Sequence, residues 1–318
     1  MSDATAPQTN TSQSQQQEGG DRTLLDDLEA IQRFHDEQAA LKPFISPPEP
    51  ITSLEDEFKN GNITFVKKAR WLATKFKQLQ RTRGDGDCFY RSLGFLLVLS
   101  LLQCGDPNLV KRVYAHLDRS LLILEQVGYE RSVTEDFWEP LRNLLSRIPG
   151  GGSTNVHDLL DRESLLAAFN DPETTNSIVV FLRLCLSAHL KLNEDRFSVF
   201  LFALDSSSGT GEPPTMDEFR ASEVEPVGKE ADHLQIAALC DFLQISLDVA
   251  YFSRSDPAFA AAEDTATTTQ SDQQTVDIVE FRIDTDASQR PSGSEGPLGF
   301  LHVGTSLYRP GHYDLLIA

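Results

Sequence analysis

The sequence has little cysteine and lacks any segment that resembles a leader peptide or a membrane anchor. Its four cysteines, Cys88, Cys104, Cys185 and Cys240, share no CxxC spacing, which argues against a zinc site or a redox pair. The last three lie in apolar helical runs, as buried free thiols do, although spacing alone does not exclude disulfides. No basic patch precedes an apolar stretch at the N-terminus, and the longest apolar run, 96–102, is too short to span a bilayer. We therefore expect a cytoplasmic protein, with the nucleus as a second location.

Positive charge is also scarce. The chain has 28 Lys and Arg against 48 Asp and Glu, which gives a net charge of -20. Such a chain should repel nucleic acid and anionic membranes, so neither is expected as a partner. A basic protein surface would suit it, and the alternative is that the acidity only keeps the protein soluble. With 318 residues, 40% of them hydrophobic, the chain can form one large domain or two small ones.

The composition changes along the first part of the chain. Residues 1–21 are rich in Gln, Ser and Thr and predict a disordered tail. Residues 22–54 predict an N-terminal arm, in which apolar residues at helical spacing over 22–40 indicate an amphipathic helix. A Pro-rich linker over 42–54 follows. Residues 55–318 are then expected to form a single main domain.

Hydrophobic periodicity within this domain changes from helical to strand-like toward its end. Helices are predicted over 62–79, 88–102, 158–169, 175–192, 196–204 and 233–243, with two more within 108–146. Strands are predicted over 245–252, 276–283, 301–309 and 312–318. Polar surface insertions are predicted over 205–215, 253–275 and 284–299. The predicted fold is therefore α+β, with a helical subdomain packed on a mainly antiparallel C-terminal sheet.

The segment Gly84-Asp85-Gly86-Asp87-Cys88 places a cysteine at the first turn of a predicted apolar helix. The two glycines permit backbone angles that other residues resist. The partial positive charge of a helix N-terminus favours the reactive thiolate, and its free N–H groups can bind a developing oxyanion. The segment therefore offers a nucleophile and an oxyanion site together. The alternative is that Cys88 is only a small core residue that starts a helix.

A second candidate group lies in the segment PGHYD, near the end of the sequence. Side chains at positions i and i+2 of a strand point to the same face, about 7 Å apart at the backbone. Asp314 can therefore accept a hydrogen bond from one ring nitrogen of His312, while the other ring nitrogen faces Cys88. This is the arrangement of acid, base and nucleophile that thiol hydrolases need. The alternative is a histidine in a turn beside a solvated aspartate.

Both segments resemble the motifs of one enzyme family. GDGDCFYRSLGF is similar to the catalytic-cysteine motif of the OTU-family deubiquitinases, especially the otubains, and LYRPGHYDLLI is similar to their C-terminal histidine motif. Between them, SIVVFLRLCLSAHL, SEVEP and EADHLQIAALCDFLQISLDVAYF resemble otubain segments in the same order. The resemblance spans about 60–318, with the three polar insertions as departures. It implies a papain-like cysteine protease fold without a metal or an organic cofactor.

The resemblance also implies a role for each matching residue. Cys88 would be the nucleophile, His312 the general base and Asp314 the orienting acid. Asp85 matches the loop aspartate whose neighbourhood helps to form the oxyanion site. The family motif usually has Asn where this chain has Asp87, and the added negative charge would disfavour the thiolate. The implied reaction is hydrolysis of isopeptide bonds at the C-terminus of ubiquitin, in polyubiquitin or in conjugates, through a thioester intermediate.

The partners that the resemblance implies are ubiquitin and polyubiquitin, with a monomer as the default state. The tail of ubiquitin carries arginines before its Gly-Gly end, so acidic residues should line the approach to the thiol. Glu223 and Glu225 are candidates, because the segment SEVEP resembles a stretch that contacts ubiquitin in otubains. The alternative is that both belong to a solvated acidic loop.

Two other functions remain open. Otubain-like proteins can also bind ubiquitin-conjugating enzymes and restrain them without catalysis, and the arm at 22–40 would then be the relevant part. The chain could instead be a cysteine protease for a ubiquitin-like modifier. Because Cys88, His312 and Asp314 are all present, the sequence does not indicate a loss of activity.

Overall fold

The computed structural model of the protein describes residues 42–152, 158–204, 213–253, 276–282 and 301–318. The chain divides into two compact units, Met1–Gln38 and Ala39–Ala318, and all described residues belong to the second unit. The predicted tail at 1–21 and the predicted amphipathic helix at 22–40 lie outside the described residues. So does most of each predicted polar insertion.

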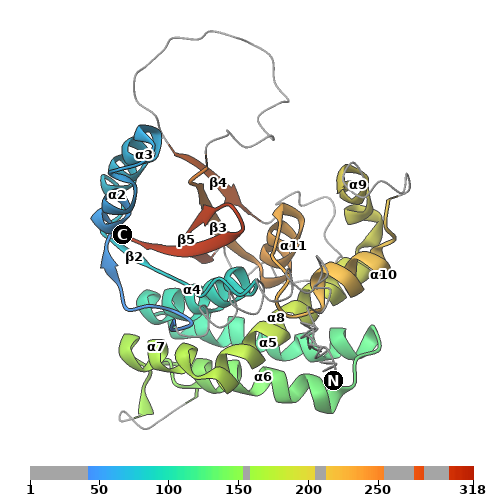
Figure 1. Ribbon diagram of the computed structural model, residues 1–318. Coiled ribbons are helices and arrows are strands. Elements are labelled where there is room, and N and C mark those ends of the chain that lie inside the picture. Colours follow the sequence, from blue (N-terminus) through green and yellow to red (C-terminus); the bar gives the residue numbers. More distant parts are fainter. Residues whose placement is uncertain (1–41, 153–157, 205–212, 254–275, 283–300) are drawn as a thin grey trace, which may run out of the picture. The chain divides into compact units, whose positions relative to one another are not determined.

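The second unit combines helices with one mixed sheet (Figure 1). The helices are α2 (Thr52–Phe58), α3 (Ile63–Ala73), α4 (Cys88–Cys104), α5 (Pro107–Gln126), α6 (Arg131–Ser146), α7 (Arg162–Asn170), α8 (Pro172–Leu192), α9 (Glu194–Leu204), α10 (Met216–Phe219) and α11 (His233–Leu243), with a π-helical turn η3 (Arg220–Val224). The strands are β1 (Glu49–Pro50), β2 (Gln78–Gln80), β3 (Ile245–Tyr251), β4 (Asp277–Phe281), β5 (Leu301–Arg309) and β6 (His312–Ile317). Their order is β1-β2-β6-β5-β3-β4, and only β3 and β5 among these neighbours run parallel. The predicted α+β class with a mainly antiparallel sheet is confirmed.

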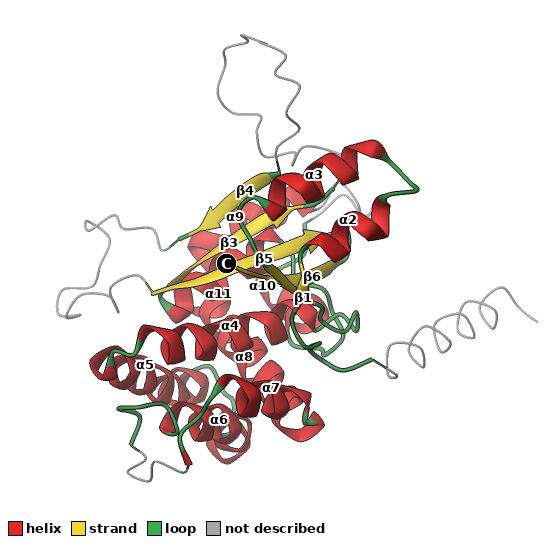
Figure 2. Cartoon of the chain, turned by 90° about the vertical axis from the view of Figure 1, so that its left-hand side faces the viewer, coloured by secondary structure: helices red, strands yellow, loops and turns green. Residues whose placement is uncertain are grey.

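Both faces of the sheet are buried. Because successive side chains of a strand point to opposite faces, each strand can contribute to two different cores. Val249 and Tyr251 of β3 join the larger core with α4 and α11, whereas Ala250 and Phe252 join a smaller core with α2 and α3. Figures 1 and 2 show α2 and α3 on one side of the sheet and α4 on the other. The final strand β6 therefore lies between two apolar layers, which fix the directions of its side chains.

Helix α4 lies between the sheet and α8. Gly94 permits the close approach of these two helices, since an added Cβ there would lie 3.1 Å from Cγ2 of Ile178. By length and composition α8 passes the test for a membrane-spanning helix, the only one to do so in the part of the chain that the structure describes, but 61% of its apolar window is buried inside the protein. We therefore interpret α8 as the central core helix, with Arg183 near its middle.

The segment over 42–54 differs from the predicted linker. It belongs to the same compact unit as the catalytic domain, pairs Ile45 with Thr82 in an isolated bridge and buries Ile51 against the smaller core. Its prolines precede α2, which begins at Thr52, and are compatible with β1, because β1 is an edge strand and a missing N–H costs little there. The domain boundary predicted at residue 55 thus falls inside this unit.

Two further predictions differ from the structure. The helix predicted over 62–79 ends at Ala73, and residues 78–80 form β2 because that segment pairs with both β1 and β6. The sheet is therefore not confined to the C-terminal quarter. Cys104 was expected to be buried but is exposed, since it is the last residue of α4 and lies beyond the core. Cys185 and Cys240 are buried as predicted, and all four cysteines are free thiols.

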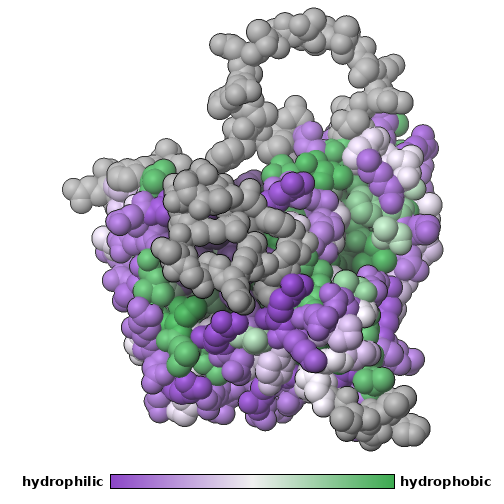
Figure 3. Space-filling view, turned by 180° about the vertical axis from the view of Figure 1, so that it is seen from behind, coloured by the Kyte–Doolittle hydropathy of each residue, from purple (hydrophilic) through white to green (hydrophobic). Residues whose placement is uncertain are grey.

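Seen from behind, the surface is mainly hydrophilic, with apolar side chains in several separate patches (Figure 3). This agrees with the net charge of -20. Among the described residues, the large apolar side chains that remain exposed come from several elements, with two of them on α9. They are Ile63, Leu122, Val133, Leu192, Val199, Phe200, Val227 and Ile278. Scattered exposure of this kind is normal for a protein surface.

Candidate active site

The thiol of Cys88 opens α4 directly after a loop that we call the nucleophile loop (residues 84–87). Cys88 is the first residue of the helix, and the first helical hydrogen bond runs from the Arg91 N–H to the Asp87 carbonyl at 3.0 Å. The N–H groups at the start of an α-helix have no partner within the helix. Because Cys88 is only 2% exposed, its thiol sits at this helix end in a site that is largely closed to water.

The imidazole of His312 lies against the same loop. His312 begins β6, and its Nε2 bonds Oδ1 of Asp314 at 2.9 Å, as the i and i+2 spacing predicts. Its Nδ1 is buried and makes no hydrogen bond with any described residue, and the Cys88 thiol lies close enough to the ring to help raise the pKa of His312. Gly84 lies against the ring, since a Cβ added there would be in ordinary van der Waals contact with Nδ1 at 3.5 Å. The structure thus brings together Cys88, His312 and Asp314 from the two ends of the domain.

The environment of His312 favours the imidazolium. Burial by itself lowers the pKa of His312, but the hydrogen bond to Asp314 and the contact with the Cys88 thiol outweigh it and raise the pKa to about 9. A protonated ring next to a thiol favours the thiolate, because opposite charges stabilise each other. The site therefore holds an imidazolium next to the Cys88 thiol at neutral pH.

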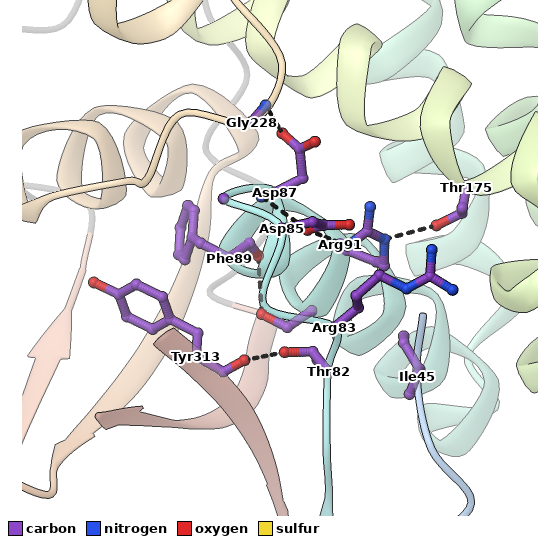
Figure 4. A network of polar contacts seen from close by, with 12 residues as sticks. Ile45, Thr82, Arg83, Asp85, Asp87, Phe89, Arg91, Thr175, Gly228 and Tyr313 are labelled. Atoms are coloured by element: carbon purple, nitrogen blue, oxygen red, sulfur yellow. Dashed lines mark hydrogen bonds and ion pairs between the residues drawn. The ribbon is translucent and has the colours of Figure 1, made fainter. Parts of the chain in front are cut away.

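Asp314 is anchored from two sides. It is fully buried, and its Oδ1 also accepts a hydrogen bond from the Thr82 N–H at 2.9 Å, while Oδ2 accepts one from Nη2 of Arg309 at 2.6 Å. Thr82 further donates its hydroxyl to the carbonyl of Tyr313 (Figure 4). Burial tends to raise the pKa of Asp314, but its hydrogen bond to His312 and the charges of His312 and Arg309 lower it overall. Asp314 is therefore a fixed carboxylate that orients the imidazole.

Asp85 shapes the nucleophile loop. Its Oδ1 accepts hydrogen bonds from Nη1 of Arg91 at 2.9 Å and from the Asp87 N–H at 3.1 Å. Arg91 is itself buried and donates through Nε to Oγ1 of Thr175 on α8 (Figure 4). Asp85 thus ties the loop to the helical core next to the predicted oxyanion site, and does not contact the imidazole in any hydrogen bond that the structure describes.

The charge of Asp87, expected from the sequence to disfavour the thiolate, is compensated in the structure. Its Oδ1 accepts hydrogen bonds from Nε of Arg183 at 3.0 Å and from the Gly228 N–H at 3.0 Å. The Arg183 side chain is completely buried. Because the two charges form an ion pair, the net charge that they present to the Cys88 thiol is close to zero.

The two acidic residues predicted to contact substrate have different surroundings. Glu225 is held by internal contacts, since its Oε1 accepts hydrogen bonds from Tyr129 at 2.7 Å, Ser187 at 2.6 Å and Arg220 at 3.1 Å. Glu223 is 45% exposed and only makes a long contact of 3.5 Å with Lys229. Of the two, Glu223 is the carboxylate that is free to meet a basic substrate segment, whereas Glu225 fixes the chain after η3.

Three residues around the site were not identified from the sequence. They are Thr82, Arg183 and Arg309. A signal existed for Arg183, because a charged residue inside the apolar run SIVVFLRLCLSAHL must find a buried partner. Thr82 and Arg309 carried no such signal, since a threonine or an arginine near a loop is ordinarily solvated. Within the described residues, no group of three or more His, Cys, Asp or Glu side chains is arranged to hold a metal ion.

Comparisons with known proteins identify the family to which the chain is similar. The family model described as Peptidase C65 Otubain matches residues 37–318. Ubiquitin thioesterase OTUB1 of Homo sapiens is 31% identical over 284 residues, which cover 89% of this chain and 86% of that protein. The OVARIAN TUMOR DOMAIN-containing deubiquitinating enzyme 1 of Arabidopsis thaliana is 29% identical over 283 residues, 89% of this chain and 83% of that protein. The solved structure of h/ceOTUB1 with ubiquitin aldehyde and UBCH5B~Ub is similar with a TM-score of 0.66 and 26% identity, and the match covers 92% of this chain and 98% of that chain.

Proposed function

The chain belongs to the otubain family of peptidases, C65, and from this premise we propose that it is a cysteine-dependent deubiquitinase. It hydrolyses isopeptide bonds at the C-terminus of ubiquitin in polyubiquitin or in conjugates. The observation that carries the proposal is the placement of the Cys88 thiol, at the start of α4, close to an imidazole that is fixed by Asp314. The family predicted from the two motifs is confirmed, and its named relatives are ubiquitin thioesterases and a deubiquitinating enzyme.

The reaction begins with attack by the Cys88 thiolate on the carbonyl carbon of the terminal glycine of ubiquitin. The carbonyl oxygen takes up the negative charge of the tetrahedral intermediate, and N–H groups at the start of α4 and in the nucleophile loop stabilise it. His312 then donates its proton to the departing lysine amine, so that the amine leaves in a neutral form. The products of this first half of the reaction are a lysine side chain with a free amine and a thioester between Cys88 and ubiquitin.

The second half of the reaction releases ubiquitin. His312, now neutral, accepts a proton from a water molecule that attacks the thioester carbonyl, and Cys88 leaves as a thiolate. Asp314 keeps its bond to Nε2 throughout, so that Nδ1 always faces the reacting atoms. The imidazolium and the thiolate are thereby restored for the next turnover.

Binding of the ubiquitin tail requires acidic side chains that can pair with its arginines. Glu223 is the predicted acidic residue whose carboxylate is exposed, and we assign it to this contact. Glu225 acts indirectly, because its bonds to Tyr129, Ser187 and Arg220 fix the chain that carries Glu223. Replacing Glu223 by Gln should therefore raise KM more than it lowers kcat.

Regulation of a ubiquitin-conjugating enzyme is a second candidate function. It is favoured by the similarity to a complex in which h/ceOTUB1 is bound to UBCH5B~Ub as well as to ubiquitin aldehyde. Such regulation requires binding but no thiol chemistry. A Cys88→Ala variant that still restrains a ubiquitin-charged conjugating enzyme would show that the chain has this second function.

The test of the deubiquitinase proposal is covalent labelling with ubiquitin that carries a C-terminal electrophile. The full chain should gain the mass of one ubiquitin on Cys88, and should react far more slowly with an equivalent probe built on a ubiquitin-like modifier. Hydrolysis of polyubiquitin should run in parallel. Preferential labelling by the ubiquitin-like probe would show that the substrate is that modifier and not ubiquitin.

Cys104 provides a matched control, because Cys88 and Cys104 are the first and the last residue of the same helix. Cys88→Ala should abolish labelling and hydrolysis, with a loss on the order of 10⁶-fold in kcat. The Cys104→Ala variant should be labelled at the wild-type rate, although in the wild-type chain the thiol of Cys104 is more exposed than that of Cys88. Labelling that survives in Cys88→Ala would contradict the assignment of the nucleophile.

A further inference from the structure

The ion pair between Asp87 and Arg183 lies beside the nucleophile but takes no part in the proton transfers described above. Arg183 is fully buried in α8, with its guanidinium 4.0 Å from the ring centroid of Tyr90, and Asp87 is 8% exposed. A buried pair of charges adds little net stability, because the cost of desolvation offsets its attraction. The pair does impose geometry, since Asp87 directly precedes the catalytic thiol.

Arg183 connects two segments that are distant in the sequence. Its Nε and Nη2 donate to Oδ1 of Asp87 at 3.0 and 2.5 Å. Its Nη1 donates to the carbonyl of Val224 at 2.9 Å, and Nη2 also donates to the carbonyl of Lys229 at 2.6 Å. We call residues 224–230, which begin with the last residue of η3, the facing loop. One guanidinium thus binds the nucleophile loop together with the start and the end of the facing loop.

Asp87 completes this connection from the other side. Its Oδ1 accepts a hydrogen bond from the Gly228 N–H at 3.0 Å, and Figure 4 shows its carboxylate directed toward Gly228. The two loops are in close contact there, since a Cβ added to Gly86 would lie 2.0 Å from the Gly228 carbonyl oxygen. Any movement of the facing loop is therefore transmitted to the residues immediately before Cys88.

We propose that Asp87 and Arg183 are positioning residues, which clamp the nucleophile loop to the facing loop and so fix the N–H groups around Cys88 for the oxyanion. This inference rests on the proposed deubiquitinase function. It assigns a role to the buried carboxylate as a hydrogen-bond acceptor and not as a source of charge. Because the two charges compensate each other, the clamp acts on the geometry of the transition state and leaves the reactivity of the thiol unchanged.

The test compares Asp87→Ala with Asp87→Asn, because asparagine keeps an acceptor oxygen and alanine does not. Hydrolysis of a fluorogenic amide at the C-terminus of ubiquitin gives kcat and KM. We expect Asp87→Ala to lower kcat about 100-fold, the scale of a misplaced reacting group, with little change in KM. Asp87→Asn should recover most of this loss, since Gly228 and Arg183 can still donate to its amide oxygen.

Alkylation by iodoacetamide separates positioning from thiol reactivity. This small reagent reacts with the thiolate and needs no oxyanion site, so its rate at Cys88, followed by mass spectrometry of the Cys88 peptide, should not fall in Asp87→Ala. A matched control is Asp241→Asn, which alters another shielded carboxylate, bonded to His189 and Arg196 away from both loops. This control should keep the wild-type kcat.

Hydrogen exchange tests the clamp without any ubiquitin substrate. Peptides that cover 84–90 and 224–230 should both exchange faster in Asp87→Ala, and neither should change in Asp241→Asn. Failure of the wild-type chain to cleave ubiquitin would overturn the proposed function alone, because the exchange experiment would still report on the clamp. If Asp87→Ala does not fold, Arg183→Lys, which keeps the charge but loses the forked donor geometry, should show the same fall in kcat and the same faster exchange.

Three results would overturn the inference. The first is a wild-type kcat in Asp87→Ala, or in Arg183→Lys where that variant is the one that folds. The second is an equal loss in Asp87→Ala and Asp87→Asn, which would assign the effect to the charge. The third is a fall in the alkylation rate that matches the fall in kcat, which would place the effect on the thiol itself.

Discussion

Two buried carboxylates belong to the site, Asp314 bonded to the imidazole and Asp87 directly before Cys88 in the chain, and their hydrogen bonds reach different kinds of groups. Asp314 bonds Nε2 of His312 and also the scaffold, through Thr82 and Arg309. Asp87 bonds only the scaffold, through Arg183 and the Gly228 N–H. Both are paired with an arginine, so burial and an ion pair do not distinguish them.

The difference lies in what each carboxylate touches. Asp314 stabilises an imidazole whose protonation changes during the reaction, so its charge matters at each step. Asp87 touches groups that never change their charge, so its acceptor geometry matters instead. A buried carboxylate close to a nucleophile therefore needs its contacts traced before it is given an electrostatic role.

Asp314→Asn gives the largest expected effect and tests the difference directly. Removing the carboxylate charge destabilises the imidazolium, so kcat should fall on the order of 10³- to 10⁴-fold, as measured with the fluorogenic ubiquitin amide at neutral pH. Asp87→Asn, the same chemical change on the other carboxylate, should keep most of the activity. Equal losses in the two asparagine variants would remove the distinction between them.

Gly86→Ala tests the nucleophile side of the comparison. Gly86 and Gly228 both have a φ of +79°. At either position the strained backbone of an alanine should lower the free energy of unfolding by about 1 kcal/mol. Only the alanine at position 86 would collide with the facing loop, since the nearest atom to an added Cβ at position 228 is 3.6 Å away. We expect kcat to fall about 100-fold in Gly86→Ala and to change little in Gly228→Ala. Similar kcat values for both would mean that contact between the loops does not position Cys88.

The pH dependence tests the imidazole side. Since the pKa of His312 is raised to about 9, the ring is protonated at neutral pH and loses its proton as the pH rises through that value. A neutral ring cannot protonate the departing amine, so kcat/KM should fall roughly tenfold per pH unit above it. The hydrogen bond to Asp314 is the first of the causes that raise this pKa, so Asp314→Asn should move the alkaline limb to lower pH. Asp87→Asn should leave the limb in place, and a shift of equal size there would contradict the division of roles.

Thr82→Val gives the smallest expected effect. It removes the hydroxyl that donates to the carbonyl of Tyr313, but it keeps the backbone N–H that donates to Asp314. The free energy of unfolding should fall by about 1 kcal/mol, as measured by urea denaturation, while kcat stays close to wild type. A loss of kcat as large as that of Asp314→Asn would show that the hydroxyl, and not the amide, fixes the carboxylate.

The sequence predicted best those features that depend on local periodicity. Alternation of apolar residues located β3 and β6, and the i and i+2 spacing predicted the contact between His312 and Asp314. Asp232, a residue type that is strongly preferred at N-caps, precedes α11 as its N-cap, and its side chain accepts a hydrogen bond from the His233 N–H. In each case the information lies within a few residues of the chain, where side-chain direction follows from backbone geometry.

Features that depend on distant partners were not predicted. The strand at 78–80 exists because it pairs with β1 and β6, and its own letters, QLQ, indicate no strand. Glu225 looked like a free acidic residue because the three residues that bind it lie at positions 129, 187 and 220. From the sequence, the charge of Asp87 was expected to act on the thiol. Its ion-pair partner, Arg183, could not be identified from the sequence, because only the packing of α8 against α4 brings the two residues together.

The strand order has a consequence for synthesis of the protein. β6 lies between β2 and β5 in the middle of the sheet, yet it is the last of the described strands to be translated. On the ribosome, the half of the sheet with β1 and β2 and the half with β3, β4 and β5 can be made but cannot join until β6 emerges. Because β6 also carries His312 and Asp314, a nascent chain holds its thiol without a base until the sheet is complete.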